Sequence, residues 1–274
     1  MERRRGNPFL EILAASIHED FRFPILEVFA FLYAISTFAF LGLGGGIASM
    51  LSPQSGEAYI HQLVSIQMGI PLFIFLILIF KNVVYGFGSE FEKGTIQTLL
   101  SYPLKRHMVL TAKLLSALGV SLLMFLGIQF FALFIMAPQT VFANLATVIV
   151  SYLASLSYPL FLTAILLIVA MKIRKGGLAL VLGIVLYFAL SVASGILTAL
   201  SITTGNPLPL KALSVLNPSL ALQYHFNPLG SLVGGEILWN PGFNEVLAYI
   251  GGGYCLVIAA FLIAYYYFSR RLNI

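Results

Sequence analysis

Six apolar stretches dominate the sequence, and each is about as long as a helix that crosses a lipid bilayer. Polar and apolar residues do not alternate within them, which argues against the strands of a membrane barrel. The sequence therefore predicts an all-α integral membrane protein, with one transmembrane domain over residues 1–274. The predicted spans cover about residues 24–47, 63–85, 109–136, 145–171, 178–202 and 246–268.

The composition agrees with a membrane protein. The chain is 59% hydrophobic and 9% charged, whereas soluble domains contain about 25% charged residues. A soluble domain of this size could not hide so much apolar surface, but lipid can cover it. The net charge of +5 would suggest nucleic acid in a soluble protein. Here the placement of the charges gives another explanation, and we expect no nucleic-acid partner.

Lysine and arginine are confined to alternate loops. The loops on one side hold fourteen of the fifteen such residues, and Lys211 alone lies on the other side. Because short cytoplasmic loops of membrane proteins are enriched in Lys and Arg, we expect both termini in the cytoplasm and the chain in the cell membrane.

Two regions outside the spans show helical patterns. Over residues 7–22, Asn7 and Pro8 are typical of a helix start, and an apolar stripe follows. This predicts an interfacial helix that leads into the first span. Over 203–245, four Asn-Pro pairs mark turns between apolar pieces too short to span. We expect short outer helices there before the sixth span; a folded cap outside the membrane is the alternative.

Glycines cluster near the outer ends of the first and sixth spans. Gly42 and Gly46 have the spacing of a close helix contact, and Gly251 and Gly252 lie in the sixth span. Packing within the chain is one interpretation. A subunit interface or a pathway is the other.

The sequence contains none of the catalytic motifs that we considered. No G-x-x-x-x-G-K-[ST], H-E-x-x-H or G-x-S-x-G pattern occurs. The single Cys255 and the four scattered histidines give no metal or disulfide framework. The span interiors hold almost no ionisable residue, so an ion-coupled carrier would lack its charge relay. A stand-alone channel or scaffold stays open, as does an intramembrane lipid-modifying enzyme that uses His225 or Glu236.

The segment 88–113 is the most polar part between two spans. If 88–103 is one helix, its polar face would hold Glu90, Lys93, Gln97 and Ser101. The opposite face would hold Phe91, Thr95, Leu99 and Tyr102, with Ile96 and Leu100 at its edge. Alternatively, Gly94 breaks the helix and Thr95 caps a shorter one. Pro103 ends the helix in either case.

Glu92 is the residue that fits this pattern least. In the continuous helix it would lie on the apolar side, where a carboxylate needs a partner. Arg22 or Lys105 could supply one. We therefore expect a structural role for Glu92, tying this helix to the N-terminal segment.

The same segment resembles the membrane subunit of ATP-binding-cassette transporters known as the type-two permease. The resemblance rests on an acid pair, Gly-Thr, Leu-Leu, Pro and a run of basic residues. Here these are Glu90, Glu92, Gly94-Thr95, Leu99-Leu100, Pro103, Lys105-Arg106 and Lys113. Ser89 departs from the family, in which many members carry Arg.

The resemblance implies a complex of two permease subunits, as a homodimer or heterodimer, with two copies of a separate ATPase. ATP and Mg would bind to the ATPase, and this chain would bind no cofactor or metal. The polar segment would be the main coupling helix. The ATPase contacts would be Glu90, Lys93, Gln97 and Ser101, with Lys172, Arg174 and Lys175 as a second contact. The residues that hold the helix would be Glu92, Gly94, Thr95, Leu99, Leu100 and Pro103.

The resemblance and the chemistry of the spans together suggest the substrate class. Family members mostly export hydrophobic or amphipathic compounds. The nearly uncharged span interiors also argue against a highly charged substrate. We therefore expect an export subunit for a hydrophobic or amphipathic compound, with membrane lipid around it.

Overall fold

The computed structural model describes residues 7–21, 24–51, 56–101, 105–233 and 236–271, and these are almost entirely helical. Within these ranges, six helices are long and apolar enough to cross a membrane. They are Ile25–Gly45, Ile70–Glu92, Arg106–Met136, Leu145–Ile173, Gly176–Thr204 and Phe243–Arg270. The predicted all-α fold with six membrane-spanning helices is confirmed, and the chain is a multi-pass membrane protein.

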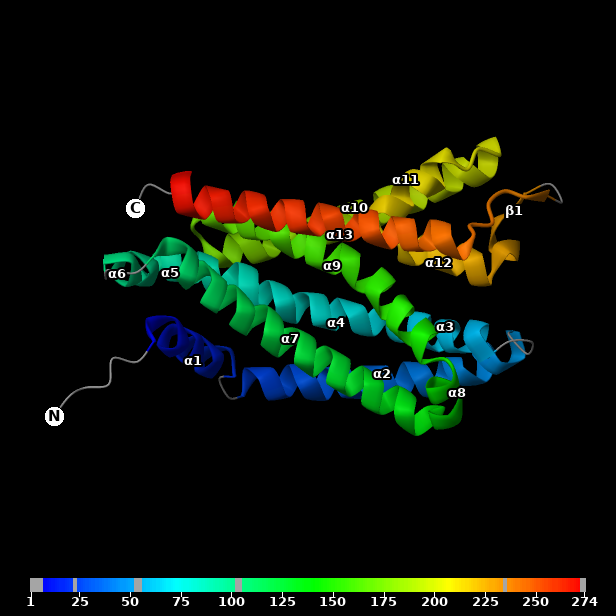
Figure 1. The fold of residues 1–274 in the computed structure, drawn as a ribbon, viewed down its shortest axis with the longest axis horizontal. Coiled ribbons are helices and arrows are strands. Elements are labelled where there is room, and N and C mark those ends of the chain that lie inside the picture. Colours follow the sequence, from blue (N-terminus) through cyan, green and yellow to red (C-terminus); the bar gives the residue numbers. More distant parts are fainter. Residues whose placement is uncertain (1–6, 22–23, 52–55, 102–104, 234–235, 272–274) are drawn as a thin grey trace.

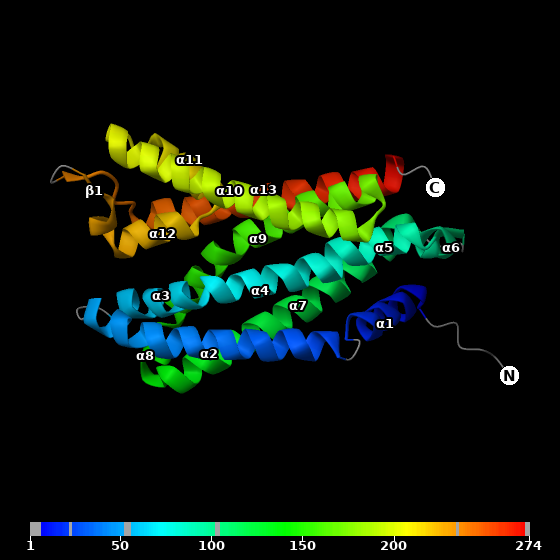
Figure 2. The same cartoon turned by 180° about the vertical axis from the view of Figure 1, so that it is seen from behind.

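The helices form an elongated bundle with two distinct ends (Figure 1). One end, which we call the terminal end, holds both chain termini. The elements there include α1 (Pro8–Asp20), α5 (Gly86–Glu92), α6 (Thr95–Ser101) and η3 (Tyr267–Arg271). The opposite end holds α3 (Gly56–Gln67), α8 (Pro138–Ala143) and α12 (Ser219–Phe226). The reverse view in Figure 2 shows the same division.

The second span differs from its predicted range. The chain breaks at Met68 and Gly69, so α3 is separate from α4 (Ile70–Ile79). Pro71 lies in the first turn of α4, where its missing N–H breaks no helical hydrogen bond. From there the helix runs on through the π-helical segment η1 (Phe80–Tyr85) into α5. The range 63–85 predicted for the second span therefore lies too early in the chain, because the observed span is Ile70–Glu92. An apolar run alone does not reveal the break.

The centre of the bundle is α9 (Leu145–Ile173). In its most apolar window 56% of the residues are buried, against 6% in α10 (Gly176–Thr204). α9 packs against α13 (Phe243–Tyr266), and it joins α7 (Arg106–Met136) through α8. α2 (Ile25–Leu51) completes the set of long helices. Lipid or another subunit must therefore cover most of α10.

A polar network links the long helices inside the apolar core. The Gln129 side-chain amide donates to the Tyr33 hydroxyl and, at 3.2 Å, to the Gln67 backbone oxygen. The Gln67 amide donates to the Gln129 backbone oxygen at 3.3 Å. The Tyr152 hydroxyl donates to Gln67 Oε1 at 3.0 Å. Such bonds between helices are worth about 1 kcal/mol each in a membrane, so they fix the relative positions of α2, α3, α7 and α9.

The segment before the sixth span contains the expected short helices. They are α11 (Leu208–Leu216), α12 and the single 3-10 turn η2 (Pro228–Ser231). A two-residue antiparallel pair, β1 (Leu232–Val233) and β2 (Glu236–Ile237), was not expected but is too short to change the fold class. Leu222, Tyr224 and Trp239 form an apolar cluster with α9 and α13. The position of these helices relative to the membrane stays a prediction.

The N-terminal helix is present as expected. Asn7 caps α1, since its side-chain oxygen accepts from the Phe9 N–H at 3.1 Å, and Pro8 is the first helical residue. α1 packs against α7 and buries Ser16, while Leu10 and Ile17 stay exposed. An interfacial position for α1 stays a prediction.

Candidate functional site

The polar segment 88–103 contains two helices. α5 ends at Glu92, and Gly94 has a φ of 76°, a left-handed conformation in which a side chain would be strained. The Gly94 backbone oxygen then accepts from the Thr98 N–H at 3.1 Å. The broken-helix alternative is therefore right, although Thr95 is the first residue of α6 and not its cap.

The break reverses the expected roles of two acidic residues. Glu90 is only 8% exposed, and its Oε1 accepts from Lys113 Nζ in an ion pair. Glu92 is exposed, and it makes no ion pair within the described ranges. The prediction of Glu90 on an open face and Glu92 on an apolar one was wrong, because it projected a continuous helix across Gly94. Of the two partners expected for Glu92, Lys105 is exposed, and Arg22 lies outside the described residues.

The other residues of this segment divide into exposed and packed groups. Lys93 and Thr95 are exposed, and Gln97 is half-buried. Ile96, expected only at the edge of the apolar face, is fully buried in the main core, and Leu100 packs against that core. Leu99 is half-buried. The Ser101 side chain and Pro103 lie outside the described residues.

The turn between α9 and α10 lies directly against α5. It carries Arg174 and Lys175, and Lys172 precedes it in the last turn of α9; all three are exposed, and we call them the basic turn. A methyl group at Gly88 would lie 2.5 Å from the Gly176 Cα atom. One at Gly176 would lie 2.7 Å from the Tyr85 backbone oxygen. The two backbones therefore touch, so the basic turn and α5 form one surface.

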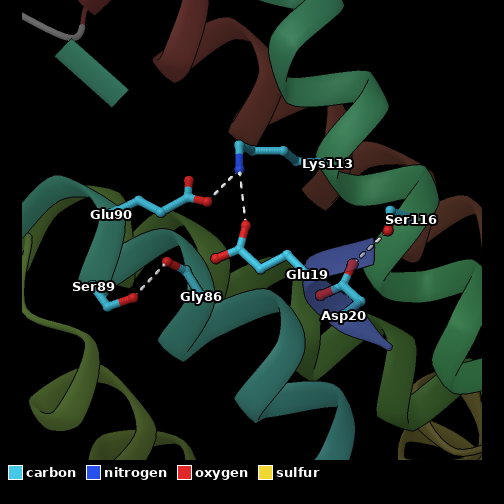
Figure 3. A network of polar contacts seen from close by, with 7 residues as sticks. All are labelled: Glu19, Asp20, Gly86, Ser89, Glu90, Lys113 and Ser116. Carbon is cyan, nitrogen blue, oxygen red and sulfur yellow. Dashed lines mark hydrogen bonds and ion pairs between the residues drawn. The ribbon is translucent and has the colours of Figure 1, made fainter. Parts of the chain in front are cut away.

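A charged cluster joins α1, α5 and α7 beneath that surface (Figure 3). Lys113 pairs with Glu90 and lies 4.0 Å from Glu19 Oε2. The Ser116 hydroxyl donates to Asp20 Oδ2. Removing one partner of a buried ion pair costs about 3–5 kcal/mol, because the other charge stays buried alone. The cluster therefore fixes α1 and α5 to the long helix α7.

The cluster borders a polar cavity of about 230 Å³ between α1, η1, α5 and α7. Lys81 Nζ donates to Asn82 Oδ1 at 2.9 Å, and Asn82 Nδ2 donates to Ser121 at 3.1 Å. Burial raises the pKa of Asp20 above its usual value, against the hydrogen bond from Ser116 and the charge of Lys81, which lower it. Sequence reasoning missed this site because its charges come from four separate elements.

The sequence also matches a known family. Residues 87–271, well over half of the chain, match the model of the ABC-2 family transporter protein. The chain belongs to this family. A search of curated proteins finds no match.

Membership in the ABC-2 family identifies the chain as a membrane transport component that works with an ATP-binding-cassette ATPase. The match begins at Phe87. It therefore includes α6, the basic turn and most of α5. α1 to α4 lie outside it, so Glu19 and Asp20 of the charged cluster come from the unmatched part of this ABC-2 permease, whereas Glu90 and Lys113 lie in the matched part.

The glycines expected at an interface differ in their surroundings. A methyl group at Gly42 or Gly251 would meet no atom within 4 Å, and one at Gly252 would meet only Val215 at 3.9 Å. A methyl group at Gly253 would lie 2.5 Å from the Ser157 hydroxyl oxygen. One at Gly44 would lie 2.8 Å from the Ile66 side chain. Among the glycines described near the outer ends of the first and sixth spans of this permease, the tightly packed ones are therefore Gly44 and Gly253. The surroundings of Gly46 lie outside the described residues.

Of the two residues proposed for an enzyme, His225 is packed within the fold. His225 Nδ1 lies 2.9 Å from the Pro241 backbone oxygen, and its ring contacts Phe226 edge-on and Phe243 at a tilt. The side chain of Glu236 lies outside the described residues. Within the described ranges, no three acidic, His or Cys side chains gather as a metal site would require. The family match favours transport over an intramembrane enzyme.

Proposed function

We propose that this chain is the membrane subunit of an exporter in which two permease subunits are driven by two copies of a separate ATPase. ATP and Mg bind to that ATPase. Fourteen of the fifteen Lys and Arg residues belong to the loops that would lie with the two termini, which supports a cytoplasmic terminal end in the cell membrane.

The observation that carries the proposal is the attachment of α5 and α6 to the long helices. The Glu90–Lys113 ion pair joins α5 to α7, and the touching backbones of Gly88 and Gly176 join it to α10. A push on α6 from an ATPase would therefore reach two spans as a rigid-body movement. Coupling through the surface formed by α5, α6 and the basic turn, which we call this corner, requires no further moving part.

The contact with the ATPase would use the exposed charges of this corner. Lys93 and Glu92 extend from the turn before α6, and the basic turn adds Lys172, Arg174 and Lys175. Glu90 leaves the set of contact residues because it is buried within the chain. Glu92 joins that set in its place.

A hydrophobic or amphipathic substrate fits an uncharged cavity of about 390 Å³ between α4 and α9 to α12. Its walls mix leucines with hydroxyl groups, among them Tyr158, Tyr187 and Ser191. The Tyr158 hydroxyl is buried and has no hydrogen-bond partner within the described residues. A neutral ligand with one polar group would satisfy that hydroxyl and fill the apolar part.

The test is co-purification of the full-length tagged chain in a mild detergent. The wild-type chain should retain an ABC ATPase whose ATP hydrolysis is measurable. Reversal of two exposed charges, Lys93→Glu with Lys172→Glu, should lower the retained ATPase at least about tenfold, as expected when interface charges repel. Lys211→Glu is the matched control, because Lys211 is a partly exposed lysine at the opposite end.

Two results would contradict the proposal. One is a wild-type chain that retains no ATPase. The other is equal retention by the reversed variant and by the Lys211→Glu control, which would move the contact away from this corner.

A further inference from the structure

The polar cavity at the terminal end has an unusual distribution of charge. Its lining includes three carboxylates and three ammonium groups, so the formal charge is balanced. The carboxylates are Glu19, Asp20 and Glu90, and the ammonium groups are Lys81, Lys93 and Lys113. A cavity of this kind favours neither an anion nor a cation as a whole, but it suits a ligand that carries both charges.

The charges are also separated between two walls. Glu19 and Asp20 belong to α1, whereas Lys81 belongs to η1 and Lys93 follows α5. Lys113 and Glu90 pair between these walls. A ligand with a positive and a negative group could therefore place each group against the opposite wall.

Several polar groups of the cavity have unused hydrogen-bonding capacity. Glu90 Oε2 is buried and has no partner within the described residues. An ammonium group has three donors, and within the described residues Lys81 Nζ donates one hydrogen bond, to Asn82. A buried carboxylate oxygen without a donor is costly, so the site favours a ligand with N–H groups.

The rim of the cavity is apolar on the side of the spans. Ile25 and Tyr85 line the cavity and are about 40% exposed, and Val28 follows one turn further along α2 at 52%. Glu19, with 66% of its side chain exposed, leaves the cavity open to a large ligand. Acyl chains could therefore lie along α2 while a headgroup enters the cavity.

We propose that this cavity binds the headgroup of a phospholipid with a primary ammonium group, the phosphatidylethanolamine class. The ammonium group donates to the carboxylates of α1 and to Glu90. The phosphate accepts from Lys81 and Lys93. Phosphatidylcholine fits the same phosphate position but lacks N–H donors. The lipid would thus join α1 to η1 and α5, and this binding requires no ATPase partner.

The test is native mass spectrometry of the purified full-length chain, incubated with equal amounts of phosphatidylethanolamine and phosphatidylcholine of matched acyl chains. The ethanolamine lipid should be retained about tenfold more, the ratio that one or two charge-assisted hydrogen bonds give. Adding one methyl group at a time to the ammonium should lower retention stepwise. Glycerophosphoethanolamine, which has no acyl chains, should fail to displace the lipid at equal concentration.

Two variants test the acidic wall and the basic wall of the cavity separately. Glu19→Gln should lower retention of the ethanolamine lipid alone, with Glu11→Gln as the control on the same helix. Lys93→Gln should lower retention of both lipids equally, with Lys105→Gln as the control. All four residues are exposed, so each variant should fold.

Equal retention of the two lipids by the wild-type chain would overturn the proposal. So would an unchanged preference in Glu19→Gln, or displacement by glycerophosphoethanolamine, which would assign the site to a soluble ligand.

Discussion

The two ends of the bundle are held together by different forces. At the terminal end, α1 and α5 are attached to α7 by ion pairs and short polar contacts around Lys113. At the opposite end, α11 and α12 are attached to α9 and α13 by an apolar cluster with Trp239. Charge contacts depend on direction and protonation, whereas apolar packing depends on volume. Within the described ranges the opposite end has one half-exposed ion pair, Lys211–Glu245 at 4.0 Å. The terminal end, whose ion pair is buried, should therefore respond more strongly to charge changes.

The largest expected effect comes from separating the buried ion pair. Lys113→Ala should lower the free energy of unfolding by about 3–5 kcal/mol, because Glu90 would stay buried without its partner. The double change Glu90→Gln with Lys113→Met should cost much less. A denaturant titration of the detergent-solubilised chain measures both, and equal costs for the single and double variants would contradict the pairing.

The matching change at the opposite end removes volume instead of charge. Leu222 is fully buried in the apolar cluster. Leu222→Ala should lower the free energy of unfolding by about 3 kcal/mol through lost apolar contact and a residual cavity. The loss should be the same at pH 5 and pH 8. A loss that depended on pH would remove the contrast between the two ends.

The backbone contact between α5 and α10 gives a third test. Gly176→Ala should lower the free energy of unfolding by about 2 kcal/mol, because the added methyl group meets backbone atoms that cannot move freely. Gly177→Ala is the matched control, since its added methyl group would meet no atom within 4 Å. The same denaturant titration applies, and equal effects at both positions would count against the contact.

The pH dependence of the terminal end should include a contribution from Asp20. Because burial raises its pKa in the folded chain, the folded state binds the proton more tightly than the unfolded state. Stability from this group should therefore fall as the pH rises from 3.8 through the raised pKa. Asp20→Asn should remove this slope, and Glu11→Gln should not, in unfolding curves recorded between pH 4 and pH 8.

The smallest effect is expected at Glu92. Its side chain is exposed, so Glu92→Gln should change the free energy of unfolding by less than about 0.5 kcal/mol. Retention of the ATPase should be the property that it changes. A loss of stability as large as that of Lys113→Ala would restore the structural role first expected for Glu92.

Much of the fold could be predicted from the sequence because lipid demands long apolar helices. The six spans, the short helices of 203–245 and the Asn7 cap followed from local patterns. Less of the candidate site could be predicted from the sequence. The two helices at Gly94 were one of two open alternatives, and a wrong projection exchanged Glu90 and Glu92. Lys113, Asp20 and Ser116 meet only because distant segments pack together, and no local pattern encodes such a contact.

The π-helical segment η1 sets the rotation of everything that follows it in the second span. The Gly86 N–H donates to the Lys81 oxygen, five residues back, so this turn holds about one residue more than an α-helical turn. If the same residues were wound as a plain α-helix, the extra residue would turn α5 by about 100° about its axis. Glu90 would then swing away from Lys113. The wide turn therefore sets the rotation of α5, so that a helix with its own apolar pattern points the Glu90 carboxylate at Lys113 of α7.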